Sequence, residues 1–311
     1  MENSLHISVS PHIRSPRTTA GIMLDVLVAL VPASVAACII FGIRSLLVIA
    51  VCIAASVLSE YLFCVITKKE NTATDLSAAV TGLLIALNLP VNVPIWQAIV
   101  GSVFAIVCVK CFFGGIGKNF ANPAITARIF MLVAFGSMAK PAFPIADTVS
   151  SATPLELLAS GEEAPGIVDL LLGMRGGALG ETCTIALLIG GIYLVARRVI
   201  NPAAPVTLIL TTFLFTLALV GGDAAVALQW TLSGGIFIGA IYMATDYSTT
   251  PTTTLGKMVF GVGSGLITVI IRFFGNYPEG VSFAILFMNI LTPYIDRLTA
   301  RRPFGSGGDA R

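Results

Sequence analysis

Charged side chains are scarce in this chain of 311 residues, because only 11% are Asp, Glu, Lys or Arg and 56% are hydrophobic. Soluble domains carry about 25% charged residues. This shortage excludes an ordinary soluble domain, and several apolar runs are long enough to cross a lipid bilayer. The net charge of +2 gives no indication of nucleic acid as a partner. We therefore expect an all-α polytopic membrane protein.

Metal-binding patterns are also lacking. Both histidines, His6 and His12, lie in the N-terminal tail, so no histidine cluster is available in the membrane. All six cysteines fall in or beside apolar runs, which argues against a disulfide framework. Cys108 and Cys111 form a CxxC pair, but two ligands do not complete a zinc or iron–sulfur site. No nucleophile–base pair or P-loop stands out, so we predict no metal centre and no catalytic residue.

Hydropathy divides the chain into about ten spans around one long polar loop. We expect a tail at 1–20, a first membrane half at 21–139, a loop at 140–180, a second half at 181–300 and a tail at 301–311. The expected spans are 21–43, 45–67, 75–90, 95–113, a fifth from Asn122-Pro123 to 139, 181–196, 202–220, 228–245, 256–274 and 281–298.

Similar Asn- and Pro-containing links at corresponding positions suggest an internal repeat. Asn122-Pro123 links spans 4 and 5, and Asn276-Tyr277-Pro278 links spans 9 and 10. Spans 3 and 8 both end in polar residues and proline, at 88–94 and 246–251. These matches favour two inverted five-helix halves with a site between broken helices. The alternative is that Asn and Pro occur there only because they are common in loops.

Lys and Arg predict the orientation, because they are enriched in cytoplasmic loops. With both termini in the cytoplasm, thirteen basic residues fall on the inner side and four on the outer side. Trp96 and Trp230 then begin spans on the outer side, as interfacial aromatic residues do. We therefore expect the 140–180 loop to be extracytoplasmic.

A few charged residues are expected at membrane depth, where such groups are functional candidates. They are Asp25, Glu60, Arg128 and Asp246. Asp25 and Asp246 lie near span ends and can reach water. Glu60 and Arg128 lie deeper, and they either form a structural ion pair or line a polar path. With Asn122, the last three are candidates for a polar path through the membrane.

The long loop contains a helix start. Thr153 suits the N-cap, Pro154 suits the first helical position, and Glu156 stands three residues after the cap. The pattern predicts a short helix over 155–160 that Gly161 ends.

The same run resembles a flavin-attachment motif. Ser150, Ser151, Ala152 and Thr153 are similar to the Ser/Thr-Gly-Ala-Thr motif of two related membrane proteins, RnfD of Rnf complexes and NqrB of the sodium-pumping NADH:quinone reductase. Asp147 and the following Pro154-Leu155 support the match. The resemblance implies FMN held by a phosphoester bond to Thr153. A phosphate there would meet the free N–H groups at the start of the helix.

The resemblance extends over nearly the whole chain and includes residues 14–17, 122–124 and 244–246. It implies a membrane subunit, not catalytic alone, of a complex that moves electrons between ferredoxin and NAD and couples this to Na⁺ or H⁺ transport. It also implies a bacterial inner-membrane location, other Rnf subunits, a flavin transferase for maturation and, in some relatives, a noncovalent riboflavin. The polar path of Asp246, Asn122, Arg128 and Glu60 is then a candidate path for an ion or for this second flavin. The shorter length favours Rnf over the quinone reductase. A passive channel or solute transporter is the alternative, because the family's fold resembles that of urea channels, but a channel needs no such loop.

Overall fold

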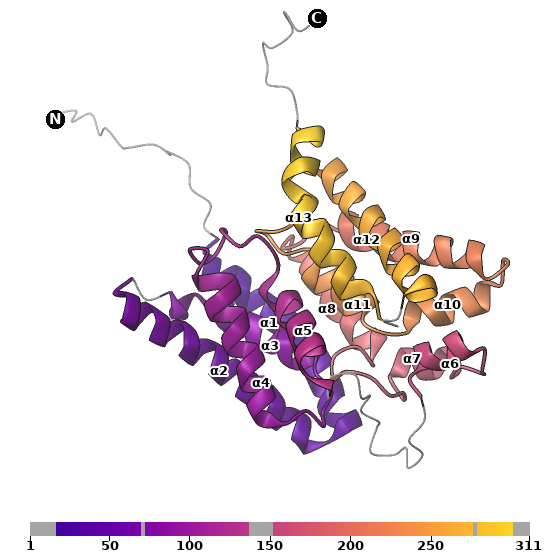
Figure 1. The fold of residues 1–311 in the computed structure, drawn as a ribbon, viewed down its shortest axis with the longest axis horizontal. Coiled ribbons are helices and arrows are strands. Elements are labelled where there is room, and N and C mark those ends of the chain that lie inside the picture. Colours follow the sequence, from indigo (N-terminus) through magenta and orange to yellow (C-terminus); the bar gives the residue numbers. More distant parts are fainter. Residues whose placement is uncertain (1–16, 70–71, 137–151, 276–278, 301–311) are drawn as a thin grey trace, which may run out of the picture.

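The computed structural model describes residues 17–69, 72–136, 152–275 and 279–300, and within them every regular element is a helix (Figure 1). Long helices stand at both ends of the described chain, and most of the elements between them are short or interrupted. In chain order the elements are α1 (Thr19–Phe41), α2 (Ile43–Thr67), η1 (Ala73–Asp75), α3 (Ser77–Leu87), α4 (Ile95–Val103), η2 (Phe104–Cys111), α5 (Pro123–Ala134), α6 (Pro154–Ser160), α7 (Ile167–Leu172), α8 (Thr184–Ala196), α9 (Ala203–Leu219), α10 (Ala224–Leu232), α11 (Ile236–Ile238), η4 (Gly239–Met243), α12 (Thr254–Phe274) and α13 (Val281–Thr299).

Every expected span corresponds to a helix in the described residues, but their lengths differ. Four helices, α1, α2, α12 and α13, are each long and apolar enough to cross a membrane alone. The bent combination of α10 with α11–η4 makes a fifth if it counts as one span. The remaining apolar helices have 10–17 residues. The membrane-protein class is therefore supported, and ten crossings remain a prediction.

Span 8 is broken, which corrects the expectation of one continuous helix over 228–245. The structure has α10, then a break, then α11–η4, with a bend of 65° between the two parts. The break lies at Ser233-Gly234-Gly235, and Gly234 has a φ of 69°. Glycine reaches this conformation without steric cost. The glycine pair is a visible signal for the break, whereas the sequence pattern predicts one only after Asp246.

The two halves pack in the same order. α2 packs against α3 and α4, and α9 packs against α10 and α12. η2 then contacts α5, as α12 contacts α13. The halves meet through α1 with α8 and through α5 with α13, and the first half lies beside the second in Figure 1. This order of contacts is compatible with the expected repeat, which remains a prediction.

The short helix α3 lies in the middle of the bundle, and all eleven of its residues are buried. The last carbonyl of α3 and the carbonyl of Leu89 just after it accept hydrogen bonds from the chain that follows α7. The N–H of Leu179 donates to the carbonyl of Leu89 at 3.0 Å, and that of Gly180 donates to Leu87 at 2.7 Å. A helix that ends inside a bundle needs such partners because its last carbonyls have none of their own.

The expected helix in the long loop is confirmed as α6, and Gly161 ends it with a left-handed φ of 77°. A second short helix, α7, was not expected. Gly166 precedes it and Gly173 follows it, which is a pattern that could have revealed it. Figure 1 shows α6 and α7 at the end of the molecule opposite the C-terminal end of α13.

The side of the membrane on which α6 lies can be tested with thiol labelling. A cysteine introduced at exposed Ser160 should react with an impermeant thiol reagent in intact cells, and one introduced at Asn201 should not. The physical reason is the bias of basic residues to the cytoplasmic side. The unsubstituted chain measures the background from its six cysteines. The reverse labelling pattern would overturn the orientation.

Candidate functional site

Thr153 is the N-cap of α6 and forms a reciprocal capping box with Glu156. Its Oγ1 accepts a hydrogen bond from the N–H of Glu156 at 3.2 Å, and its own N–H donates to Glu156 Oε2 at 2.7 Å. Thr153 is half-buried, and Ala152 beside it is exposed. The other predicted motif residues, Asp147, Ser150 and Ser151, lie outside the described residues. The structure therefore presents one hydroxyl of the motif, on an anchored helix start.

Leu155 holds α6 against the break in span 8. It is 3% exposed. A Cβ added to Gly234 would lie 2.7 Å from Leu155 Cδ1 and 2.9 Å from Arg272 Nη2. The glycine therefore permits a close approach of the helix behind Thr153 to the broken helix and to a buried guanidinium.

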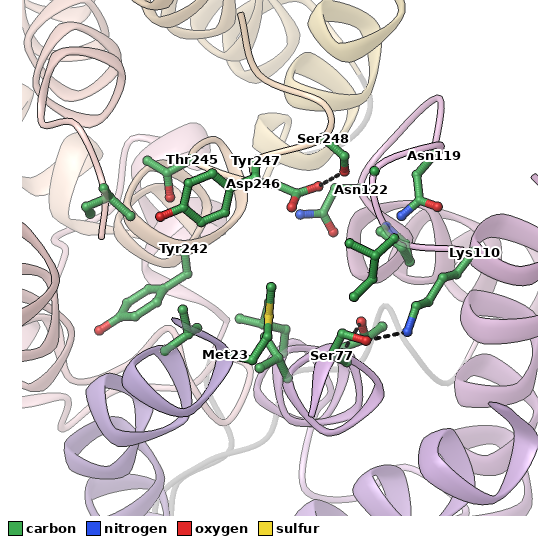
Figure 2. Close-up of a pocket in the computed structure, with 18 of the residues that line it drawn as sticks. Met23, Ser77, Lys110, Asn119, Asn122, Tyr242, Thr245, Asp246, Tyr247 and Ser248 are labelled. Carbon is green, nitrogen blue, oxygen red and sulfur yellow. Dashed lines mark hydrogen bonds between the residues drawn. The ribbon is translucent and has the colours of Figure 1, made fainter. Parts of the chain in front are cut away.

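A cavity of about 270 Å³ lies between the two halves. Its lining is apolar in part, with Met23, Val80 and Leu84. Asp246 and Asn122 lie on one wall, and Ser77 and Met23 lie across from them (Figure 2). The polar lining includes Ser77, Lys110, Asn119, Asn122, Asp246 and Ser248. We call this space the Asp246 cavity.

Asp246 and Asn122 reach this cavity from segments that follow and precede helices. The Asp246 carboxylate accepts hydrogen bonds from Ser248 Oγ at 3.0 Å and Thr249 Oγ1 at 3.1 Å. Asn122 caps α5 through Oδ1, which accepts from the N–H of Ala124 at 2.9 Å, and its Nδ2 donates to the carbonyl of Met243 at 3.3 Å. The structure thus brings together two of the predicted path residues.

Glu60 does not pair with Arg128, which corrects one of the two expectations for these residues. Its partner is Lys110, whose Nζ donates to Oε1 at 2.8 Å and Oε2 at 2.7 Å. Lys110 also donates to Ser77 Oγ, and both charged residues are almost fully buried. The charge count from the sequence places Lys110 among the inner loop charges instead. Its position inside the apolar run 104–113 is compatible with burial but does not identify Glu60 as its partner.

Arg128 belongs to a different group of charges. It is 6% exposed, and its guanidinium contacts the carboxylates of Glu181, at 3.4 Å, and Glu279. It also donates to Asn88 Oδ1 at 2.7 Å, at the end of α3. Sequence reasoning missed both glutamates. Glu181 is the first residue of the expected span 6, which was a weak signal for a buried position.

Two more arginines are buried beside this group, although the charge count assigns both to outer loops. Arg175 donates to the carbonyl of Leu232 at 2.7 Å. Arg272 donates to the carbonyls of Trp230 at 2.6 Å and Ser233 at 2.9 Å. These carbonyls end α10, where the break leaves them without intrahelical partners. We call Arg128, Arg175, Arg272, Glu181 and Glu279 the arginine cluster.

Asp25 forms an ion pair near the ends of α1 and α8. Its carboxylate accepts from Arg197 Nη2 at 3.2 Å and from the Tyr193 hydroxyl at 3.0 Å. The Arg197 side chain is 59% exposed. An exposed pair of this kind joins two helices and is weakly stabilising, so we assign Asp25 no part in the Asp246 cavity.

Known proteins resemble this chain over nearly its whole length. The model of the NQR2, RnfD, RnfE family matches residues 6–305. The chain is 47% identical to the D subunit of the Na⁺-translocating ferredoxin:NAD⁺ oxidoreductase complex of Acetobacterium woodii, over 98% of this chain and 96% of the relative. It is 38% identical to the D subunit of the proton-translocating ferredoxin:NAD⁺ oxidoreductase complex of Clostridium ljungdahlii, over 98% and 97%. The D subunit of an ion-translocating oxidoreductase complex of Stutzerimonas stutzeri is 34% identical, over 91% of each chain.

Proposed function

Because this chain belongs to the NQR2, RnfD, RnfE family and is a membrane subunit of an Rnf-type ion-translocating oxidoreductase complex, we propose that it carries FMN on Thr153 and couples electron transfer between ferredoxin and NAD to cation movement. The near-complete match to relatives that are D subunits of such complexes carries the proposal. It favours an oxidoreductase subunit over the passive channel. The chain needs the other subunits, since it offers no recognisable NAD or iron–sulfur motif.

The geometry of Thr153 fits a covalent phosphoester. Esterification replaces the hydroxyl hydrogen, whereas the cap uses the oxygen as an acceptor for the N–H of Glu156. The bond to the helix can therefore persist after attachment. Bound in this way, FMN would supply electron transfer. Thr153 would fix its position, with Leu155 anchoring the helix behind it. A separate flavin transferase is the proposed maturation partner.

The Asp246 cavity fits the second element of the proposal, a path for the coupling cation or a noncovalent riboflavin. One carboxylate, amides and hydroxyls provide oxygen ligands for Na⁺ or a place for a proton. The apolar wall beside them suits the flat ring of a flavin. Glu60 adjoins this path through Lys110, whereas Arg128 contributes to the arginine cluster instead. The relatives' names include both Na⁺ and proton translocation, so transport measurements must decide the ion.

Asp246→Asn should reduce cation uptake relative to electron flow while the complex still assembles. The amide keeps the shape and can still accept from Ser248 and Thr249, but it loses the charge that attracts a cation. Ferredoxin-driven NAD reduction and uptake of ²²Na⁺ or protons would be measured in the same vesicles. Asp25→Asn removes an equal charge outside the cavity and serves as the control. Unchanged uptake and redox rates would remove Asp246 from the mechanism.

A further inference from the structure

The arginine cluster holds three positive side chains against two carboxylates. All three arginines are buried, with exposed fractions of 3–6%. Among the described residues, Arg128 is the one arginine of the three that contacts carboxylates, those of Glu181 and Glu279. Arg175 and Arg272 donate to backbone carbonyls, including those of Glu181 and Glu279. Counted over the residues that the structure describes, the cluster therefore has a surplus of one formal positive charge.

A surplus buried charge is costly unless an opposite charge lies nearby. Loss of a proton from an arginine does not remove this surplus charge. Burial lowers the pKa of Arg175 to about 10, which leaves its guanidinium charged at neutral pH. The carbonyls at the end of α10 carry only partial negative charge. An anion that does not belong to the cluster's own side chains would therefore stabilise the cluster.

The N-terminal end of α6 approaches this cluster through Leu155, which packs beside Gly234 and Arg272. A Cβ added to Gly234 would touch both Leu155 and Arg272, so these two side chains lie on the same side of the break. Thr153 is two residues before Leu155. Glu156 already places one carboxylate at Thr153. A phosphodiester there adds a second negative charge, which raises the need for positive charge nearby.

Resting on the proposed attachment of FMN to Thr153, the geometry points to a further role for the arginine cluster: it stabilises negative charge at Thr153, on the phosphodiester and on the flavin when an electron arrives. Each electron adds one negative charge to the flavin. A fixed positive charge close by favours this reduction and raises the reduction potential. Arg128, Arg175 and Arg272 are thus positioning and tuning residues and exchange no electrons themselves.

The test is a potentiometric titration of the covalent flavin in the purified complex, with two variants of opposite charge change. Arg272→Gln keeps hydrogen-bond donors for the carbonyls of Trp230 and Ser233 but removes the charge, so the potential should fall. Glu279→Gln removes a negative charge, so the potential should rise. We expect about a tenfold change in the one-electron equilibrium, which is about 59 mV.

Matched controls make the same charge changes at the Asp25–Arg197 pair, outside the cluster. Arg197→Gln and Asp25→Asn should leave the potential unchanged. Unaltered potentials in both cluster variants, or shifts of the same sign, would overturn the inference. If Arg272→Gln does not fold, Glu279→Gln decides the sign by itself. Absence of any flavin on wild-type Thr153 would instead defeat the proposed function, and the chain's mass reports that separately.

Discussion

Thr153→Val should abolish covalent flavin on this chain. In a denaturing gel the wild-type band should fluoresce under ultraviolet light, and its mass should exceed the sequence mass by one FMN less one water. Valine has nearly the shape of threonine but no hydroxyl, so no phosphoester can form. Loss of the N-cap should cost about 1 kcal/mol, which is too little to unfold a helical bundle of this size. The expected result is a folded chain with a dark band.

Thr153→Ser is the matched control, because it keeps a hydroxyl that can both cap Glu156 and accept a phosphoryl group. It should retain part of the fluorescence. Fluorescence that persists in the valine variant would move the attachment elsewhere, with Ser150 and Ser151 next in order. A wild-type chain made together with its flavin transferase that still carries no flavin would defeat the flavin proposal and leave the family assignment intact.

The sequence was sufficient to predict those elements that depend on interactions between neighbouring residues. The capping box at Thr153 and the stop at Gly161 depend on a few neighbouring residues and their own backbone, so the sequence was sufficient for α6. The long apolar helices α1 and α2 were also predictable, because hydropathy marks their ends directly. The break at Ser233–Gly235 was predictable in principle, but the apolar residues on both sides concealed it.

The charge partners could not be predicted in this way. Arg128 pairs with glutamates that are 53 and 151 residues away in the sequence. No periodicity connects such positions, because the bundle alone brings them together. Lys110 and Arg272 both lie near the ends of apolar helices, where a charge is ordinarily assigned to a loop. Both residues can be buried because they have partners that a hydropathy pattern does not reveal. The partner of Lys110 is Glu60, and the partners of Arg272 are the carbonyls left without intrahelical hydrogen bonds at the break.

Glu60→Gln should strongly destabilise the chain. Lys110 is 2% exposed, and its ammonium has two Glu60 oxygens and Ser77 Oγ as partners. Removal of the carboxylate leaves a buried positive charge without compensation. Breaking a buried ion pair in this way costs about 3–5 kcal/mol. Thermal unfolding of the detergent-solubilised complex can be monitored through the loss of monodisperse protein. The midpoint temperature of this loss should be clearly lower than for the wild type.

The double variant Glu60→Leu with Lys110→Met separates the two roles that the sequence left open for Glu60. It removes both charges and keeps similar volumes, and such replacements are often neutral or stabilising. Restored stability with normal cation uptake would identify the pair as a structural tie between α2 and η2. Restored stability with lost uptake would place it in the ion path beside the Asp246 cavity, which Lys110 lines. A single Glu60→Gln variant as stable as wild type would contradict the burial argument itself, because an uncompensated ammonium there must be unfavourable.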